Sequence, residues 1–183
     1  EKAAQFIQLC NQIDVPILFL HNITGFIVGT DFEQGGITKN GSKMVNAVSN
    51  STVPHITIIV GASYGAGNYG MSGRAFGTKF TYIWPFSKIA VMGPSVMAGV
   101  MTIVGRGAAA RRGVEFDEEA DAQRAAFAEH WAEERSKGLY ATSRVSDDGM
   151  IDPRDTRNVI AMSLSACHNN SVKGTKEYGT WRM

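Results

Sequence analysis

The sequence has little of what marks several large classes of protein. Its two cysteines, Cys10 and Cys167, belong to no Cys-x-x-Cys pair or His/Cys cluster, so we expect two buried thiols and no metal site. Eighteen Lys and Arg residues against 17 Asp and Glu residues give a net charge of +1, which is not the basic footprint of a nucleic-acid-binding protein. No run of about 18 apolar residues is present, so no segment is expected to span a membrane.

What the chain does have is enough apolar content for a core. It is 183 residues long and 44% hydrophobic, which favours one domain. It begins without Met in the amphipathic pattern "EKAAQFIQLCNQ", which predicts a helix over residues 2–13 and not a signal peptide. We therefore expect the chain to be a piece of a longer protein.

Strand-like and helix-like segments alternate after this helix. The strands are expected at "PILFL", predicted to be buried on both faces, "VPHITIIVG", "KFTYIWP" and "KIAVM". The helices are expected at "SKMVNAVSN", "GAGNYGMSGRA", "PSVMAGVMTIV", residues 115–137 and from about Pro153. "HNITGF" is expected to form a loop, "DFEQGGITKNG" to form turns, and Gly138 to end the helix over 115–137, which would place Phe127 and Trp131 on one side. The alternation predicts an α/β fold with a mostly parallel sheet.

Two of these strands are followed by unusual loops, "HNITGFIVG" and "GASYGAGNYG". Sites in open α/β sheets form beyond the carboxyl ends of the strands. If the two strands are neighbours, Gly25 and Phe26 lie close to Ala66 and Gly67.

The glycines of "GAGNYG" allow more than one interpretation. A nucleotide site is disfavoured, because Lys88 stands where the ribose-binding carboxylate of a GxGxxG motif is expected. A helix N-terminus has unpaired N–H groups, and small residues such as Ala66 and Gly67 let a carbonyl oxygen approach them, which favours an oxyanion hole completed from Gly25 and Phe26. The alternative is that the glycines only permit tight helix–strand packing.

Most of the chain resembles the carboxyltransferase (β) subunit of biotin-dependent acyl-CoA carboxylases. The similarity is greatest to methylcrotonoyl-CoA carboxylase and geranyl-CoA carboxylase, and its specific pieces are "NITGF", "YGAGNYGM" and "DDGMIDPRDTR". The resemblance implies a crotonase (ClpP/crotonase-like) spiral of ββα units. It also implies that residues 1–183 are the C-terminal, biotin-side carboxyltransferase domain, with the N-terminal half absent.

The resemblance further implies a reaction and its residues. A carboxyl group would move from carboxybiotin, held on a partner carrier domain, to an acyl-CoA enolate. Ala66 and Gly67 would donate backbone N–H groups to the ureido oxygen of biotin, and Gly25 and Phe26 would line the same pocket. The substrate-binding residues would be Tyr64, Gly65 and Tyr69, with Tyr69 influencing the choice of acyl group or serving only as a helix-face aromatic.

The expected partners are the α subunit, which carries biotin carboxylase and the biotin carrier, and other copies of the β subunit. The active site would form where this domain faces another subunit. The expected location is the cytoplasm in a bacterium and the mitochondrial matrix in a eukaryote. One departure is that relatives have a "GGEQAA"-like segment where this chain has "GPSVMAGVMTIV", which predicts a wider, more apolar pocket or a different acyl-CoA.

Two alternatives to the enzyme are an inert assembly module of the holoenzyme and a serine hydrolase. Residues 61–65 spell GxSxG around Ser63, and Asp152 and His168 follow in the order of a triad, although the chain is short for that fold. Asp147, Asp148 and Asp152 are close enough for metal ligation, but "DDGMIDP" more simply predicts a turn and a helix cap.

Overall fold

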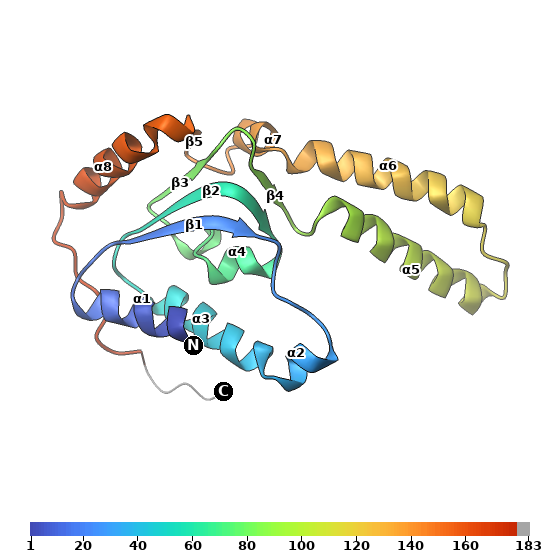
Figure 1. The fold of residues 1–183 in the computed structure, drawn as a ribbon, viewed down its shortest axis with the longest axis horizontal. Coiled ribbons are helices and arrows are strands. Elements are labelled where there is room, and N and C mark those ends of the chain that lie inside the picture. Colours follow the sequence, from blue (N-terminus) through green and yellow to red (C-terminus); the bar gives the residue numbers. More distant parts are fainter. Residues whose placement is uncertain (179–183) are drawn as a thin grey trace.

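A parallel sheet forms the centre of the fold in the computed structural model, which describes residues 1–178 (Figure 1). The strands run in the order β1-β2-β3-β5, and β4 pairs with the later part of β2. All pairings between these strands are parallel, as the α/β alternation predicts. The strands are β1 (Ile17–Ile23), β2 (His55–Tyr64), β3 (Phe80–Ile83), β4 (Lys88–Ala90) and β5 (Gly149–Met150).

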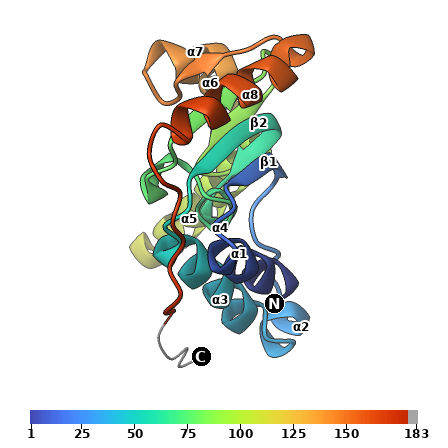
Figure 2. The ribbon, with the colours of Figure 1, turned by 90° about the vertical axis from the view of Figure 1, so that its left-hand side faces the viewer.

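Helices lie on both sides of these strands. Figure 2 shows α1 and α3 below the strands and α8 above them. Within residues 1–178 no helix has the length and apolar character needed to cross a membrane. The helices are α1 (Lys2–Gln12), α2 (Thr30–Gln34), α3 (Ile37–Asn50), α4 (Ala66–Gly70), α5 (Pro94–Arg112), α6 (Glu118–Ser136), α7 (Gly138–Ser143) and α8 (Thr156–Cys167), with short 3-10 turns at Arg74–Phe76 and Pro153–Asp155.

The main core joins α1 and α3 to the lower face of β1. Its buried side chains are Ala4, Ile7, Cys10, Ile17, Phe19, Ala47, Val48 and Val53. Only this face of β1 is buried, because Leu18 and Leu20 on the other face are 41% and 51% exposed. The prediction of a strand buried on both faces was therefore wrong. β1 lies at the edge of the sheet, and no described element covers its upper face.

The pairing of β1 with β2 contains an irregularity. His21 pairs with Ile59, but Ile23 pairs with Ser63. Between these pairs β2 advances by four residues while β1 advances by two, so β2 contains a bulge. β1 continues to Ile23, so the loop predicted at "HNITGF" begins at Thr24, three residues later than expected.

Two segments with glycine-rich sequences are more helical than predicted. "DFEQGGITKNG" was expected to form turns, but it contains most of α2 and the start of α3. A Cβ on Gly41, inside α3, would lie 3.1 Å from Cε1 of Phe26. This glycine therefore leaves room for an aromatic ring and does not end a helix. Gly138 was expected to end the helix before it, but α6 already ends at Ser136 and Gly138 is the first residue of α7.

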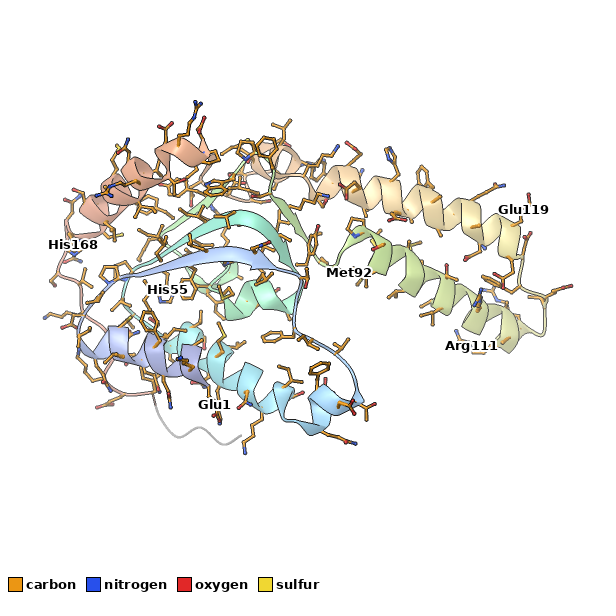
Figure 3. All side chains as sticks on the ribbon, viewed as in Figure 1. Glu1, His55, Met92, Arg111, Glu119 and His168 are labelled. Atoms are coloured by element: carbon orange, nitrogen blue, oxygen red, sulfur yellow. The ribbon has the colours of Figure 1, made fainter. Side chains whose placement is uncertain are left out.

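Helices α5 and α6 form a hairpin that extends away from the sheet (Figure 1). Met92 lies at its root, and Arg111 and Glu119 lie at its far tip (Figure 3). Phe127 and Trp131 do face one side of α6, but they are 70% and 43% exposed. The α6 side chains that are buried are small or polar, namely Asp121, Ala128, Ala132 and Ser136.

Candidate functional site

The loops after β1 and β2 meet at the start of α4. Gly25 has φ +117° and Gly65 has φ +59°, conformations that L side chains rarely adopt. A Cβ on Gly67 would lie 3.1 Å from Cα of Gly25 and 3.2 Å from Cδ1 of Ile23. The prediction that the two glycine loops lie together is therefore confirmed for Gly25 and Gly67. Tight packing is also a real role of these glycines.

The backbone donors at this junction differ in their partners. Gly65 N–H donates to Ala90 O at 3.0 Å, and Asn68 N–H donates to Gly65 O at 3.1 Å. The N–H groups of Ala66 and Gly67 donate to no other residue among 1–178. These are the first two positions of α4, where N–H groups have no partner within the helix. The arrangement leaves two adjacent donors without a partner, of which Ala66 is exposed and lines the neighbouring cavity, whereas Gly67 is buried.

Phe26 contributes to this junction in a different way from Gly25. Its ring lies over two glycines, because a Cβ on Gly41 would be 3.1 Å from Phe26 Cε1 and a Cβ on Gly70 would be 3.2 Å from Phe26 Cζ. The side chain therefore packs against α3 and the end of α4. This contact ties the Gly25–Phe26 turn to the helix that carries Ala66 and Gly67.

The three predicted substrate-binding residues do not share one environment. Gly65 and Tyr69 line a cavity of about 350 Å³ together with Ala66. The ring of Tyr69 is half exposed and lies edge-on to Phe76, with centroids 5.7 Å apart. Tyr64 is buried, and its ring contacts the position of Gly93 at the start of α5. Tyr64 is therefore separate from the cavity that holds the other two.

Three polar residues meet at this site, and only Ser63 among them was singled out from the sequence, as a possible nucleophile. Ser63 Oγ lies 2.9 Å from Nδ1 of His21 and accepts a hydrogen bond from Nδ2 of Asn68 at 2.8 Å. His21 Nε2 lies 2.6 Å from the carbonyl oxygen of Met71. Burial lowers the pKa of His21, and the hydrogen bond to Met71 O partly opposes this shift. The spacing of 42 residues between His21 and Ser63 gives no local signal, so the sequence did not pair them.

The structure does not form the catalytic triad that the serine hydrolase alternative requires. Ser63 is fully buried, and its hydroxyl is engaged by His21 and Asn68. His168 lies at the end of α8, where Nδ1 is 2.7 Å from Leu164 O (Figure 3). Asp152 instead pairs with Arg154. Neither of the predicted triad partners reaches Ser63.

The aspartates of "DDGMIDP" have structural partners. Asp152 accepts a hydrogen bond from Arg154 N at 2.8 Å and caps the 3-10 turn before α8. Asp148 accepts from Thr81 N at 2.7 Å, and Asp147 accepts from Thr142 Oγ1 at 2.9 Å. The predicted turn is confirmed, but the side-chain cap is on the 3-10 turn, and α8 itself has no side-chain cap. In the part of the chain that the structure describes, no three His, Cys, Asp or Glu side chains gather as metal ligands would.

The chain belongs to the carboxyltransferase family. The Carboxyl transferase domain matches residues 1–179. The chain is 55% identical over 183 residues to the probable biotin-dependent acyl-coenzyme A carboxylase beta2 subunit of Mycobacterium tuberculosis, covering 100% of this chain and 35% of that protein. It is 50% identical over 183 residues to the probable mitochondrial methylcrotonoyl-CoA carboxylase beta chain of Drosophila melanogaster, covering 100% of this chain and 31% of that protein. The chain thus spans about a third of the length of these relatives.

Solved structures agree with the family assignment. The beta subunit of Pseudomonas aeruginosa geranyl-CoA carboxylase matches with a TM-score of 0.85 and 42% identity, over 100% of this chain and 34% of that one. Transcarboxylase 12S, a hexamer solved with hydrolysed methylmalonyl-coenzyme A bound, matches with a TM-score of 0.79 and 32% identity, over 98% of this chain and 33% of that one. The predicted crotonase-type α/β fold is confirmed.

Proposed function

We propose that this chain is the biotin-side carboxyltransferase domain of an acyl-CoA carboxylase β subunit. It would take part in moving a carboxyl group from carboxybiotin to the enolate of a methylcrotonoyl-CoA-like substrate. The observation that carries the proposal is the pair of N–H donors at Ala66 and Gly67, which have no partner among residues 1–178 and lie beside Gly25. The relatives named as carboxylase beta subunits support the same reaction class.

Ala66 and Gly67 fit the ureido group of biotin, because its carbonyl oxygen can accept hydrogen bonds from backbone N–H groups that have no other partner among residues 1–178. Bound carboxybiotin supplies the carboxyl group. Ala66 and Gly67 would donate to the ureido oxygen and so stabilise negative charge on it. The absent Cβ of Gly67 lets α4 pack against Gly25 and Ile23, and the positive φ of Gly65 sets the turn that presents Ala66. A preorganised donor of this kind contributes roughly 10²–10³-fold to kcat.

The acyl-CoA side of the reaction fits the cavity next to these donors. Tyr69, Ala66 and Val91 line it, and the hydroxyl of Thr81 is buried there without a hydrogen-bond partner. The apolar residues of "GPSVMAGVMTIV" lie mostly on the exposed surface of α5. We therefore assign the choice of acyl chain to Tyr69 and its neighbours and not to the body of α5.

A substitution that removes one donor tests the proposal. Ala66 is the first residue of α4, a position where proline is tolerated because its N–H has no helical partner. In the full β subunit assembled with its biotin-carrying partner, Ala66→Pro should lower kcat for 3-methylcrotonyl-CoA by roughly 10²–10³-fold. Glu118→Pro makes the same change at the first residue of α6, and kcat should stay within about twofold of wild type because no residue of α6 lines the cavity beside Ala66. Equal rates in the two variants would refute the role of Ala66.

A second candidate function is an assembly module that is inert by itself. The exposed apolar side chains of the hairpin favour it, since Val100, Ile103 and Val104 are 43%, 71% and 61% exposed. The partners would be other β subunits and the α subunit. Light scattering of the chain alone, with a parallel assay of carboxyl transfer, separates the two candidates. Oligomers without turnover would favour assembly, and turnover by the chain alone would exclude an inert module.

A further inference from the structure

His21, Ser63 and Asn68 form one continuous chain of hydrogen bonds. The carbonyl oxygen of Met71 can only accept, so the His21 nitrogen 2.6 Å away, Nε2, carries the proton. In the neutral ring Nδ1 is then an acceptor, and the Ser63 hydroxyl donates to it at 2.9 Å. Ser63 Oγ in turn accepts from Asn68 Nδ2 at 2.8 Å. Every donor and acceptor on this path has one consistent role.

The orientation of Asn68 is fixed from its other side as well. A Cβ on Gly73 would lie 1.7 Å from Asn68 Oδ1, so the side-chain carbonyl occupies space that only glycine leaves free. Gly73 N–H also donates to Asn68 O at 2.8 Å. The amide therefore keeps Oδ1 toward Gly73 and Nδ2 toward Ser63.

This path connects both strands to the middle and the C-terminal end of one short helix. His21 lies on β1 and Ser63 on β2, while Asn68 lies within α4 and Met71 follows its last residue. Helix α4 has five residues, which is too short to be stable without tertiary contacts. His21 and Ser63 are fully buried, so water does not compete for these bonds. The position of α4 relative to the sheet thus depends on this path.

We infer that His21, Ser63 and Asn68 are positioning residues, which hold α4 so that the N–H groups of Ala66 and Gly67 meet the reacting oxygen. This inference rests on the proposed function. Ser63 and Asn68 also line the cavity of about 350 Å³ and His21 does not, but none of the three is placed at the reacting oxygen, and their effect passes through the backbone of α4. A misplacement of about 1 Å at such a donor costs up to roughly 10²-fold in rate.

A matched pair of serine substitutions tests the inference in the full β subunit assembled with its biotin-carrying partner. Ser63→Ala removes the centre of the path. Ser163→Ala is the control, because Ser163 is also buried and makes two hydrogen bonds, to Val159 O at 2.8 Å and with Tyr82 Oη at 2.9 Å, on α8. We expect kcat to fall about 10–100-fold in Ser63→Ala, with KM for acyl-CoA changed less than about twofold. Ser163→Ala should lose a similar amount of stability and keep its kcat.

Two further measurements separate positioning from general destabilisation. His21→Gln can still donate to Met71 O, whereas His21→Phe keeps a ring without any donor, so the Gln variant should recover at least about tenfold in kcat over the Phe variant. Hydrogen exchange of the amides of residues 66–71 should be faster in Ser63→Ala than in Ser163→Ala. Equal kcat in the two serine variants, or equal exchange of these amides, would overturn the inference. If the wild-type holoenzyme did not carboxylate acyl-CoA, the proposed function on which this inference rests would be overturned.

Discussion

The sheet with α4 and the α5–α6 hairpin use apolar residues in opposite ways. In the sheet, Ile56, Ile58 and Ile59 are at most 1% exposed. In the hairpin, Ile103 and Phe127 are 71% and 70% exposed, and the two helices are joined by polar contacts such as Thr102 Oγ1 to Asp121 Oδ2 at 2.6 Å. One region therefore gains its stability from burial, whereas the other presents apolar surface. This difference separates the part that shapes the site from the part that is available for contact with another surface.

The largest expected effect tests whether burial accounts for this difference. Ile58→Ala removes a fully buried side chain and should lower the free energy of unfolding by about 2–5 kcal/mol, from lost transfer energy and a cavity. Ile103→Ala removes an exposed one and should change it by less than about 0.5 kcal/mol. Urea denaturation of both variants measures the two values. Similar losses would mean that the hairpin is buried in the same way as the sheet.

A second test uses the histidines of the two regions. Burial lowers the pKa of His55 on β2 from 6.5 to about 4, so the folded state resists a proton that the unfolded chain accepts. Stability is complete above pH 6.5 and should fall on acidification from 6.5 toward 4, by on the order of 3 kcal/mol.

The matched variants for this test are His55→Asn and His130→Gln, the latter on the exposed surface of α6. His55→Asn should flatten the dependence of unfolding free energy on pH, with a remainder from His21, whose pKa burial also lowers. His130→Gln, which removes an exposed imidazole, is the control for the loss of a histidine and should change the dependence less than His55→Asn does. The opposite ranking would show that the buried histidine is not the source of the acid sensitivity.

The smallest expected effect compares one glycine from each region. Gly65→Ala places a side chain at φ +59° and a Cβ 3.0 Å from Val91 O, so it should cost about 1–3 kcal/mol of stability. Gly107 lies inside α5 with nothing within 4 Å of its Cβ position, and Gly107→Ala should add about 0.5–1 kcal/mol. Thermal unfolding measures whether each substitution raises or lowers stability. A gain of stability in Gly65→Ala would contradict the conformational constraint on the loop before α4.

The sequence predicted the strands and helices whose pattern of apolar residues is regular over a short stretch. The alternation of strands and helices gave the α/β fold, and the two glycine loops were placed together from strand topology alone. The helical start of α3 was missed because a glycine such as Gly41 is typical of turns. In the structure, Gly41 lies within the helix and leaves room for the ring of Phe26. The hydrogen-bonded path from His21 to Ser63 was missed because it depends on strand register across 42 residues. Long-range register of this kind has no trace in local composition.

The irregularity in β2 sets the side on which its last residues point. Between the pairs His21–Ile59 and Ile23–Ser63, β2 gains two residues over β1, and an even gain preserves the alternation of faces. Loss of a single codon among residues 60–62 would turn Ser63 to the upper face and bring the phenol of Tyr64 beneath the sheet. The number of residues in this stretch, more than their identity, therefore decides whether a hydroxyl small enough for His21 and Asn68 stands between them.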